Sequence, residues 1–296
     1  MTVSNNTNQM QNVESLFDAA KMELLSSNKL SHQPFSDVVM ASFQTNFPIK
    51  YDEFTKLEQI LLRNVSLKIH HSDNMYESPD AKHYLNVGLS AMRCIETALI
   101  SQNKTNSVNA IMDFPCGYGR ILRFLRARFP KADITISELE TAAVDFCKLE
   151  FSTDSLEANT DLSKLPTNKQ YDLIWCGSLV THLDQHNATE LLRYFYSILA
   201  PDGLCIFSSH GSVVAQWIEE KRFSYGLTES AQQKLLAMFN DKGYGYADYG
   251  HLDGYGISVV SHRCMSAIAR SVGLANEVMF IEQGWGNHHD VYCFSK

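Results

Sequence analysis

Residues 111–120, IMDFPCGYGR, form the most informative stretch of the chain. Residues 111–114 are an apolar run typical of a buried strand, and the two glycines that follow allow a sharp turn close to a ligand. We expect a helix over residues 120–128, ending before Pro130, and then a second strand that ends at Glu138. A carboxylate at that strand end lies where a ribose presents its two hydroxyl groups, so the pattern predicts a nucleoside cofactor site.

The third small-residue position separates two kinds of cofactor site that share this arrangement. In a dinucleotide-binding G-x-G-x-x-G/A turn, that residue lets the helix pack closely beneath a pyrophosphate. Leu122 stands there, which disfavours a pyrophosphate and therefore NAD. The stretch instead resembles motif I of class I S-adenosylmethionine-dependent methyltransferases. The matching residues are Asp113, Cys116, Gly117 and Gly119, with Pro115 at the position of the family's usual first glycine.

The resemblance continues from about Tyr84 to the C-terminus and implies an α/β fold with a doubly wound, mostly parallel, seven-stranded sheet. Residues 171–176 look like the family's fourth strand, and a Pro-Gly turn over residues 200–203 leads into a fifth. The last two strands, 277–281 and 290–294, would form an antiparallel hairpin. The implied cofactor is S-adenosyl-L-methionine. The residues implied to bind it are Tyr84, Asp113, Pro115, Cys116, Gly117, Tyr118, Gly119, Arg120, Glu138, Leu139, Asp161, Leu162, Cys176, Gly177 and Ser178.

Composition excludes several classes of protein. The 296 residues carry a net charge of −8 and no basic run, which argues against nucleic acid as the substrate. The chain begins with a polar tract and has no run of about 18 apolar residues. We therefore expect a cytoplasmic protein with no membrane partner. The seven cysteines form no C-x-x-C pair, and most lie in apolar patterns typical of buried thiols in a reducing compartment.

The chain is longer than a bare methyltransferase fold, and two additions are predicted. Residues 1–78 are expected to form an N-terminal helical cover, and residues 79–296 the methyltransferase domain. The tripeptide SPD at 78–80 is typical of a helix start, and that helix should run to about Ile100. Residues 212–258 are expected to form an insertion after strand five that faces the substrate as a lid.

Two histidines are candidate catalytic bases. Ligands of open α/β sheets bind at the carboxyl ends of the strands, and His182 and His210 follow the fourth and fifth predicted strands. Because histidine titrates near neutrality, either could remove a proton from a methyl acceptor. The alternative is that each is a loop histidine bonded to the backbone. Asp184 is expected to cap the helix that follows.

Arg120 and Tyr84 each leave two interpretations open. Arg120 lies at the start of a helix, where the helix dipole disfavours a cation, so a carboxylate of the cofactor or of an anionic substrate would stabilise it. The alternative is a salt bridge to an acidic side chain nearby. Tyr84 would contact the cofactor from the helix before strand one, or else it is a core aromatic residue.

The insertion is rich in aromatic residues and glycines, a composition that suits an adaptable wall around a small molecule. The loop before the last strand would close the same pocket. The residues expected to bind substrate are Trp217, Tyr225, Tyr255, Trp285 and His288. An oligomer contact is the alternative role for these aromatic residues, and a homodimer is left open as the assembly.

A metal site is not expected, although histidines recur in the sequence. His182 and His186 are four residues apart, and His288, His289 and Asp290 are consecutive. Consecutive histidines in a strand point to opposite faces, which disfavours ligation of one ion. A carboxylate-rich cluster at strand four, which an octahedral oxygen site would need, is absent from the sequence.

The expected function is therefore S-adenosylmethionine-dependent methylation of a small molecule. One alternative is another transfer on the same fold, of an aminopropyl or carboxymethyl group. The other is a non-catalytic scaffold that keeps the cofactor fold. The acceptor, its reacting atom and the use of a general base are not encoded in any motif.

Overall fold

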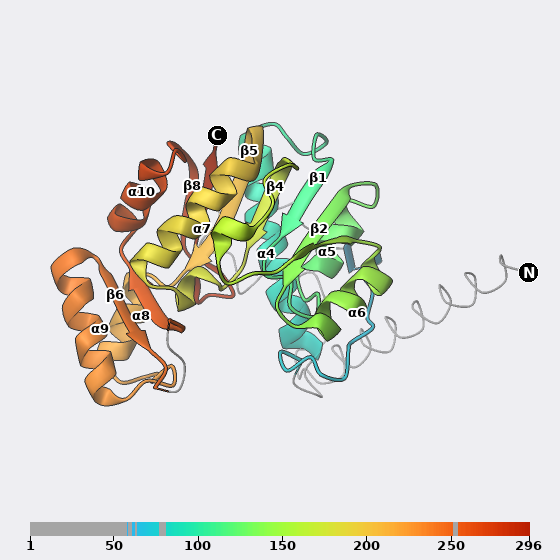
Figure 1. Ribbon diagram of the computed structural model, residues 1–296. Helices are drawn as coiled ribbons and strands as arrows, with labels where there is room; N and C mark the ends of the chain where they lie inside the picture. Colours follow the sequence, from blue (N-terminus) through green and yellow to red (C-terminus); the bar gives the residue numbers. More distant parts are fainter. Residues whose placement is uncertain (1–57, 59–60, 63, 77–80, 251–253) are drawn as a thin grey trace, which may run out of the picture.

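The computed structural model describes residues 58, 61–62, 64–76, 81–250 and 254–296 (Figure 1). Most of the predicted N-terminal cover and the helix start at 78–80 lie outside these residues. The helix α4 (Ala81–Ser101) agrees with the predicted helix that reaches Ile100. No helix in the described ranges combines the length and the apolar character needed to cross a membrane.

A seven-stranded sheet forms the centre of the molecule, in the order β3-β2-β1-β4-β5-β9-β8. The first five strands in this order, from β3 through β2, β1 and β4 to β5, are parallel. The strand β9 runs antiparallel to both β5 and β8. The predicted closing hairpin is therefore present. In sheet order the strands are Asp154–Glu157, Asp133–Glu138, Ala110–Asp113, Tyr171–Cys176, Leu199–Ser209, His289–Ser295 and Asn276–Trp285.

Helices cover both faces of this sheet, which is why its central strands are apolar throughout. The helices α4, α5 (Leu122–Arg128) and α6 (Thr141–Phe151) share one buried apolar cluster with one face. The helices α7 (Gln185–Ile198) and α10 (His262–Ser271) share a second cluster with the other face. This doubly wound arrangement agrees with the predicted fold class.

The predicted turn over residues 200–203 is instead a bulge within β5. Tyr171 pairs with Leu199 and Leu173 pairs with Leu204, so the four residues 200–203 of β5 lie opposite the single residue Asp172 of β4. Asp202 takes a positive φ of 60° in this bulge, and Gly203 lies close to the backbone of Tyr171. The prediction of a turn that separates a helix from strand five is therefore wrong in detail, because the chain continues in β5 on both sides of the bulge and the positive φ falls on Asp202.

The insertion after β5 is a small folded unit with its own core. It comprises α8 (Ser212–Glu219), α9 (Glu229–Lys242) and an antiparallel pair formed by β6 (Tyr244–Asp248) and β7 (Gly256–Val260). Its buried residues form a third apolar cluster. Two of its glycines serve this packing, because a Cβ on Gly245 would lie 2.1 Å from the Leu235 carbonyl and one on Gly256 would lie 2.0 Å from the Ala247 carbonyl. These glycines therefore permit close backbone contact and do not make an adaptable loop.

Candidate cofactor and acceptor site

The two glycines of the loop after β1 have different roles. Gly117 has a φ of +51° and Gly119 a φ of +81°, so both use the left-handed region that favours glycine. A Cβ on Gly119 would lie 2.5 Å from Phe151 Cε2, which shows that this glycine lets α6 pack against the loop. A Cβ on Gly117 would meet nothing within 4 Å. Gly117 is thus the glycine that leaves open space beside the loop.

Glu138 ends β2 directly opposite this loop. Its Oε2 accepts a hydrogen bond of 3.0 Å from the Gly117 N–H, and its Oε1 accepts one of 2.7 Å from the Leu139 N–H. The carboxylate is thereby fixed next to the open side of the loop. The Leu139 side chain is 67% exposed at the same strand end, an uncovered apolar surface of the kind that a bound ring could cover.

Asp113, at the end of β1, is buried and carries an unsatisfied acceptor. Its Oδ2 has no hydrogen-bond partner among the described residues, and the side chain is 1% exposed. Burial raises the pKa of Asp113, and the charge of Glu138 raises it further. The Cys116 and Cys176 side chains are also buried, so these two residues can meet a cofactor only through their backbone atoms.

Tyr84 is a buried residue whose hydroxyl is already engaged. It donates a hydrogen bond of 2.7 Å to Asp73 Oδ2, and the ring is 1% exposed. The structure therefore favours the core interpretation of Tyr84 over direct cofactor contact. Arg120 lies 6.0 Å from the centre of this ring, and burial lowers the pKa of Arg120. Within the described ranges, no acidic side chain forms an ion pair with Arg120, so the predicted alternative of a salt bridge is not found there.

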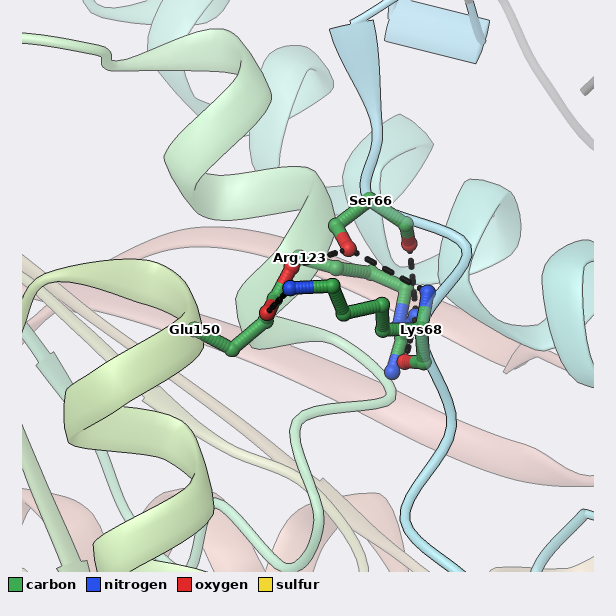
Figure 2. A network of polar contacts seen from close by, with 4 residues as sticks. All are labelled: Ser66, Lys68, Arg123 and Glu150. Atoms are coloured by element: carbon green, nitrogen blue, oxygen red, sulfur yellow. Dashed lines mark hydrogen bonds and ion pairs between the residues drawn. The ribbon is translucent and has the colours of Figure 1, made fainter. Parts of the chain in front are cut away.

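Arg123 hydrogen-bonds both to residues 66–68, in the segment before α4, and to the glycine loop. It is not among the residues identified from the sequence. Its Nη1 donates to the carbonyls of Ser66 and Lys68 at 2.6 and 3.1 Å, and its Nε donates to the Gly119 carbonyl at 3.1 Å. Figure 2 shows this contact beside the hydrogen bonds from Ser66 and Lys68 to Glu150 on α6. The only available signal was a charged residue within the apolar face of α5.

The same segment reaches over the cofactor loop through stacked rings. His70 stacks on Tyr118 with ring centres 4.7 Å apart, and the Tyr118 hydroxyl donates to Glu140. The part of the predicted cover that the structure describes therefore lies against the loop.

The remaining predicted cofactor residues follow β3 and β4. Asp161 caps the short helix η1 (Leu162–Lys164), with its carboxylate accepting from Ser163 and paired with Lys164 at 3.1 Å. Ser178 takes a positive φ of 65° and donates its N–H to Ser208 Oγ at 2.8 Å. A Cβ on Gly177 would lie 2.9 Å from Trp285, so the chain after β4 passes close to that indole.

His182 lies in the short helix η2 (Val180–His182), just beyond β4. Its Nδ1 is 2.8 Å from the Gly256 carbonyl, and because a carbonyl only accepts, Nδ1 carries the proton and Nε2 keeps its lone pair. The Tyr255 ring stacks on the imidazole with centres 4.7 Å apart. Burial lowers the pKa of His182, which keeps the ring neutral near pH 7. Asp184 accepts from the Asn187 N–H at 2.8 Å, so its predicted capping role is confirmed.

His210 is the centre of a second group of rings. The His288 and His289 rings lie 5.3 and 4.9 Å from it, and the Tyr225 ring lies at 5.3 Å. Trp217 in turn lies 5.2 Å from His288. Burial, followed by the nearby His288 and His182, lowers the pKa of His210 to about 3. Such an imidazole is a weak base near neutrality, so His182 is the stronger candidate for proton removal.

All five predicted substrate residues contact these two groups, but Trp285 does so as a buried residue whose ring lies 4.8 Å from that of His289. Tyr255 belongs to the His182 group, whereas Trp217, Tyr225 and His288 belong to the His210 group. Trp285 is only 3% exposed and donates its indole N–H to the Val87 carbonyl at 3.0 Å. It is a core residue that packs between Gly177 and α4, because the end of β8 folds back onto that helix.

Charged residues beside the glycine loop influence the ionisation of the rings around His182 and His210. We call the surroundings of the loop the cofactor half of the site, and the two ring groups its acceptor half. The charge of Glu138 adds to burial in raising the pKa of Tyr255. The charge of Arg120 adds to burial in lowering the pKa of His289. The parallel pairing of β2, β1, β4 and β5 places their carboxyl ends at one edge of the sheet, and the Tyr255 ring of the insertion stacks on His182 at that edge.

Comparison with known proteins identifies the central part of the chain. Residues 112–205 match the family described as a methyltransferase domain. This part of the chain is similar to a methyltransferase domain. A malonyl-[acyl-carrier protein] O-methyltransferase of Priestia megaterium is 30% identical over 118 residues, covering 38% of this chain and 42% of that protein. The enzyme of the same name from Acetivibrio thermocellus is 27% identical over 126 residues, 42% of each protein. The chain thus spans less than half the length of these curated relatives.

A solved structure supports the fold of this methyltransferase domain. It is the S-adenosylmethionine-bound CalS10, an amino pentose methyltransferase from Micromonospora echinaspora, with a TM-score of 0.50. The two chains are 14% identical, and the match covers 76% of this chain and 99% of that one. The predicted doubly wound, seven-stranded fold is confirmed.

Proposed function

We propose that the protein transfers the methyl group of S-adenosyl-L-methionine to a small-molecule acceptor. The observation that carries this proposal is the Glu138 carboxylate, fixed by the Gly117 N–H beside the open side of the loop. A nucleoside ribose donates two hydroxyl groups, and a fixed carboxylate accepts both. The matched methyltransferase domain includes the loop and this acid.

The other cofactor contacts follow from position. Gly117 lets the cofactor approach the loop backbone, and Leu139 would cover one face of the adenine. Arg120, partly buried and without an ion pair among the described residues, would bind the carboxylate of the methionine moiety. Asp161 and Leu162, at the start of η1, would contact the adenine edge.

The acceptor would bind among the rings around His182 and His210. His182 presents Nε2 as a free lone pair, because Nδ1–H donates to the Gly256 carbonyl. It is therefore placed to take a proton from an acceptor hydroxyl or ammonium as the methyl group is transferred. The insertion contributes Trp217, Tyr225 and Tyr255, which would bury an apolar acceptor and exclude water.

The nucleoside product tests this proposal against the other transfers. The protein is incubated with S-adenosylmethionine and a low-molecular-weight extract, and the products are separated by mass spectrometry. Methyl transfer leaves S-adenosylhomocysteine together with an acceptor that has gained one methyl group. Methylthioadenosine as the product would show transfer of the aminocarboxypropyl chain of S-adenosylmethionine and overturn the proposal. In a parallel incubation, methyl-labelled S-adenosylmethionine is added with an unfractionated cell extract. Label that appears only in macromolecules would overturn the small-molecule acceptor.

We expect Glu138→Ala to weaken S-adenosylhomocysteine binding by roughly 1.5–3 kcal/mol, the usual contribution of hydrogen bonds to a charged group. Titration calorimetry measures the change, with circular dichroism confirming the fold. Glu157→Ala is the matched control, because Glu157 ends the adjacent strand β3 and is exposed. An unchanged dissociation constant in folded Glu138→Ala would show that this acid does not bind the ribose.

A further inference from the structure

Three histidines from two segments gather at the carboxyl end of β5. His210, His288 and His289 each contribute one ring nitrogen to the cluster, and these three nitrogens all lie within 4.8 Å of one another. The antiparallel pairing of β5 with β9, in which Ser209 faces Asp290, brings the two segments side by side. The cluster is therefore a product of the sheet and not of one flexible loop.

The local geometry explains how consecutive histidines share a site. His288 lies in the turn between β8 and β9, and His289 is the first residue of β9. The rule that successive side chains point to opposite faces applies only within a strand. The His288 and His289 rings accordingly lie 5.2 Å apart. The argument from opposite strand faces, which disfavoured one ion for these two residues, therefore does not apply to His288.

The cluster also contains unsatisfied polar atoms. Nδ1 of His210 and Nδ1 of His289 are buried and have no hydrogen-bond partner among the described residues. A buried polar atom without a partner costs about 1–3 kcal/mol. Two of the three imidazoles in the cluster therefore have a ring nitrogen without a partner among the described residues. Imidazole nitrogen is a preferred ligand of zinc, copper, nickel and iron, so the three rings are a donor set that suits a transition metal.

We propose that His210, His288 and His289 bind one divalent transition-metal ion, of the class that includes Zn²⁺ and Co²⁺. Three imidazoles leave a fourth position open, the pattern of catalytic metal sites, for a water or an oxygen of the acceptor. Metal–nitrogen bonds of about 2.0–2.1 Å need the nitrogens somewhat closer than 4.8 Å, a change that small side-chain rotations supply.

The surroundings suit such an ion. The Tyr225 hydroxyl lies 3.1 Å from His288 Nε2, so it orients that ring or offers the metal an oxygen. A bound cation would lower the pKa of an acceptor hydroxyl on the fourth position and would assist His182 in removing its proton.

Metal titration of the tag-free protein tests the proposal directly. The protein is treated with chelator, dialysed and titrated with Co²⁺, followed by the visible absorption of the bound ion, and with Zn²⁺ by calorimetry. We expect one ion per chain, and a loss of affinity of more than about 100-fold in His288→Ala, since even outer-shell changes cost 10–100-fold. The control His186→Ala removes an exposed histidine outside the cluster and should bind the ion as the parent does.

His289→Gln is the second variant, and S-adenosylhomocysteine binding reports whether each variant is folded. Absence of stoichiometric binding by the parent protein would overturn the proposal. Equal affinity in the parent and in folded His288→Ala or His289→Gln would overturn it as well. The measurement needs neither an acceptor nor methyl transfer, so its failure would leave the proposed function standing, and the reverse also holds.

Discussion

We expect His182→Gln to lower the turnover of methyl transfer by ~10²–10⁴-fold, the usual contribution of a general base. The Nδ1–H of His182 donates to the Gly256 carbonyl, so the free Nε2 is the atom that takes the proton. Glutamine keeps the polar character and most of the volume but offers no basic nitrogen. Cofactor affinity should change little, because His182 belongs to the acceptor half of the site. Single-turnover rates and S-adenosylhomocysteine titrations measure the two quantities separately.

The pH profile distinguishes proton removal from positioning. Burial lowers the pKa of His182 from its ordinary value of 6.5, so the neutral, basic form is present above that lowered pKa. The parent rate should therefore fall only when the pH drops below this lowered pKa, and so on the acid side of the ordinary histidine value. His182→Gln should lack this acid limb, and His186→Gln should keep it. A rate loss of only a few-fold with an unaltered profile would mean that positioning alone carries the reaction, as with an acceptor that is already a free amine or thiolate.

Gly119→Val should destabilise the fold and not merely block the cofactor. Gly119 has a φ of +81°, a region that costs other residues about 1–2 kcal/mol, and valine is among the least tolerant of it. The added Cβ would also lie 2.5 Å from Phe151 Cε2, and overpacking of this kind costs about 1–3 kcal/mol. We therefore expect a loss of about 2–5 kcal/mol in the free energy of unfolding, measured by denaturant titration.

Gly117→Ala is the matched comparison. It shares the positive φ, at +51°, but its Cβ would meet no atom within 4 Å, so only the backbone cost of about 1–2 kcal/mol applies. Its stability should remain closer to that of the parent, while its cofactor affinity falls. Equal stability of Gly119→Val and the parent protein would contradict the packing role of Gly119.

The sheet and the cofactor loop could be predicted because their signals are local. Residues 171–176 are apolar except for Asp172 near the strand entry, and β4 has these same bounds because both faces of the strand are covered. Glu138 was placed correctly at the end of β2, since a strand of this kind ends where its apolar run ends. The helix cap at Asp184 follows from side-chain chemistry within one turn.

The features that were missed depend on contacts between distant segments. Gly245 and Gly256 look like flexible residues in the sequence, yet their role is close packing against Leu235 and Ala247. Arg123 looks like an ordinary helix residue until the Ser66 and Lys68 carbonyls are placed beside it. Trp285 is an aromatic residue of the type that often binds ligands, but packing of the end of β8 against α4 buries it.

The cluster of His210, His288 and His289 belongs to the same category. Its existence depends on the pairing of β5 with β9 and on the turn that precedes β9. Neither the register of that pairing nor the turn geometry is encoded by the three histidines themselves. Spacing along the chain could therefore suggest the ligand types but not their convergence.

Titration calorimetry of the full chain with S-adenosylhomocysteine tests the central claim most directly, because it requires no knowledge of the acceptor. The account predicts one site per chain, and a weaker site in folded Glu138→Ala but not in Glu157→Ala. It also predicts that NAD, which needs a pyrophosphate cradle that Leu122 disfavours, gives no heat of binding. Absence of S-adenosylhomocysteine binding by the folded parent protein would contradict the cofactor assignment and, with it, the proposed methyl transfer.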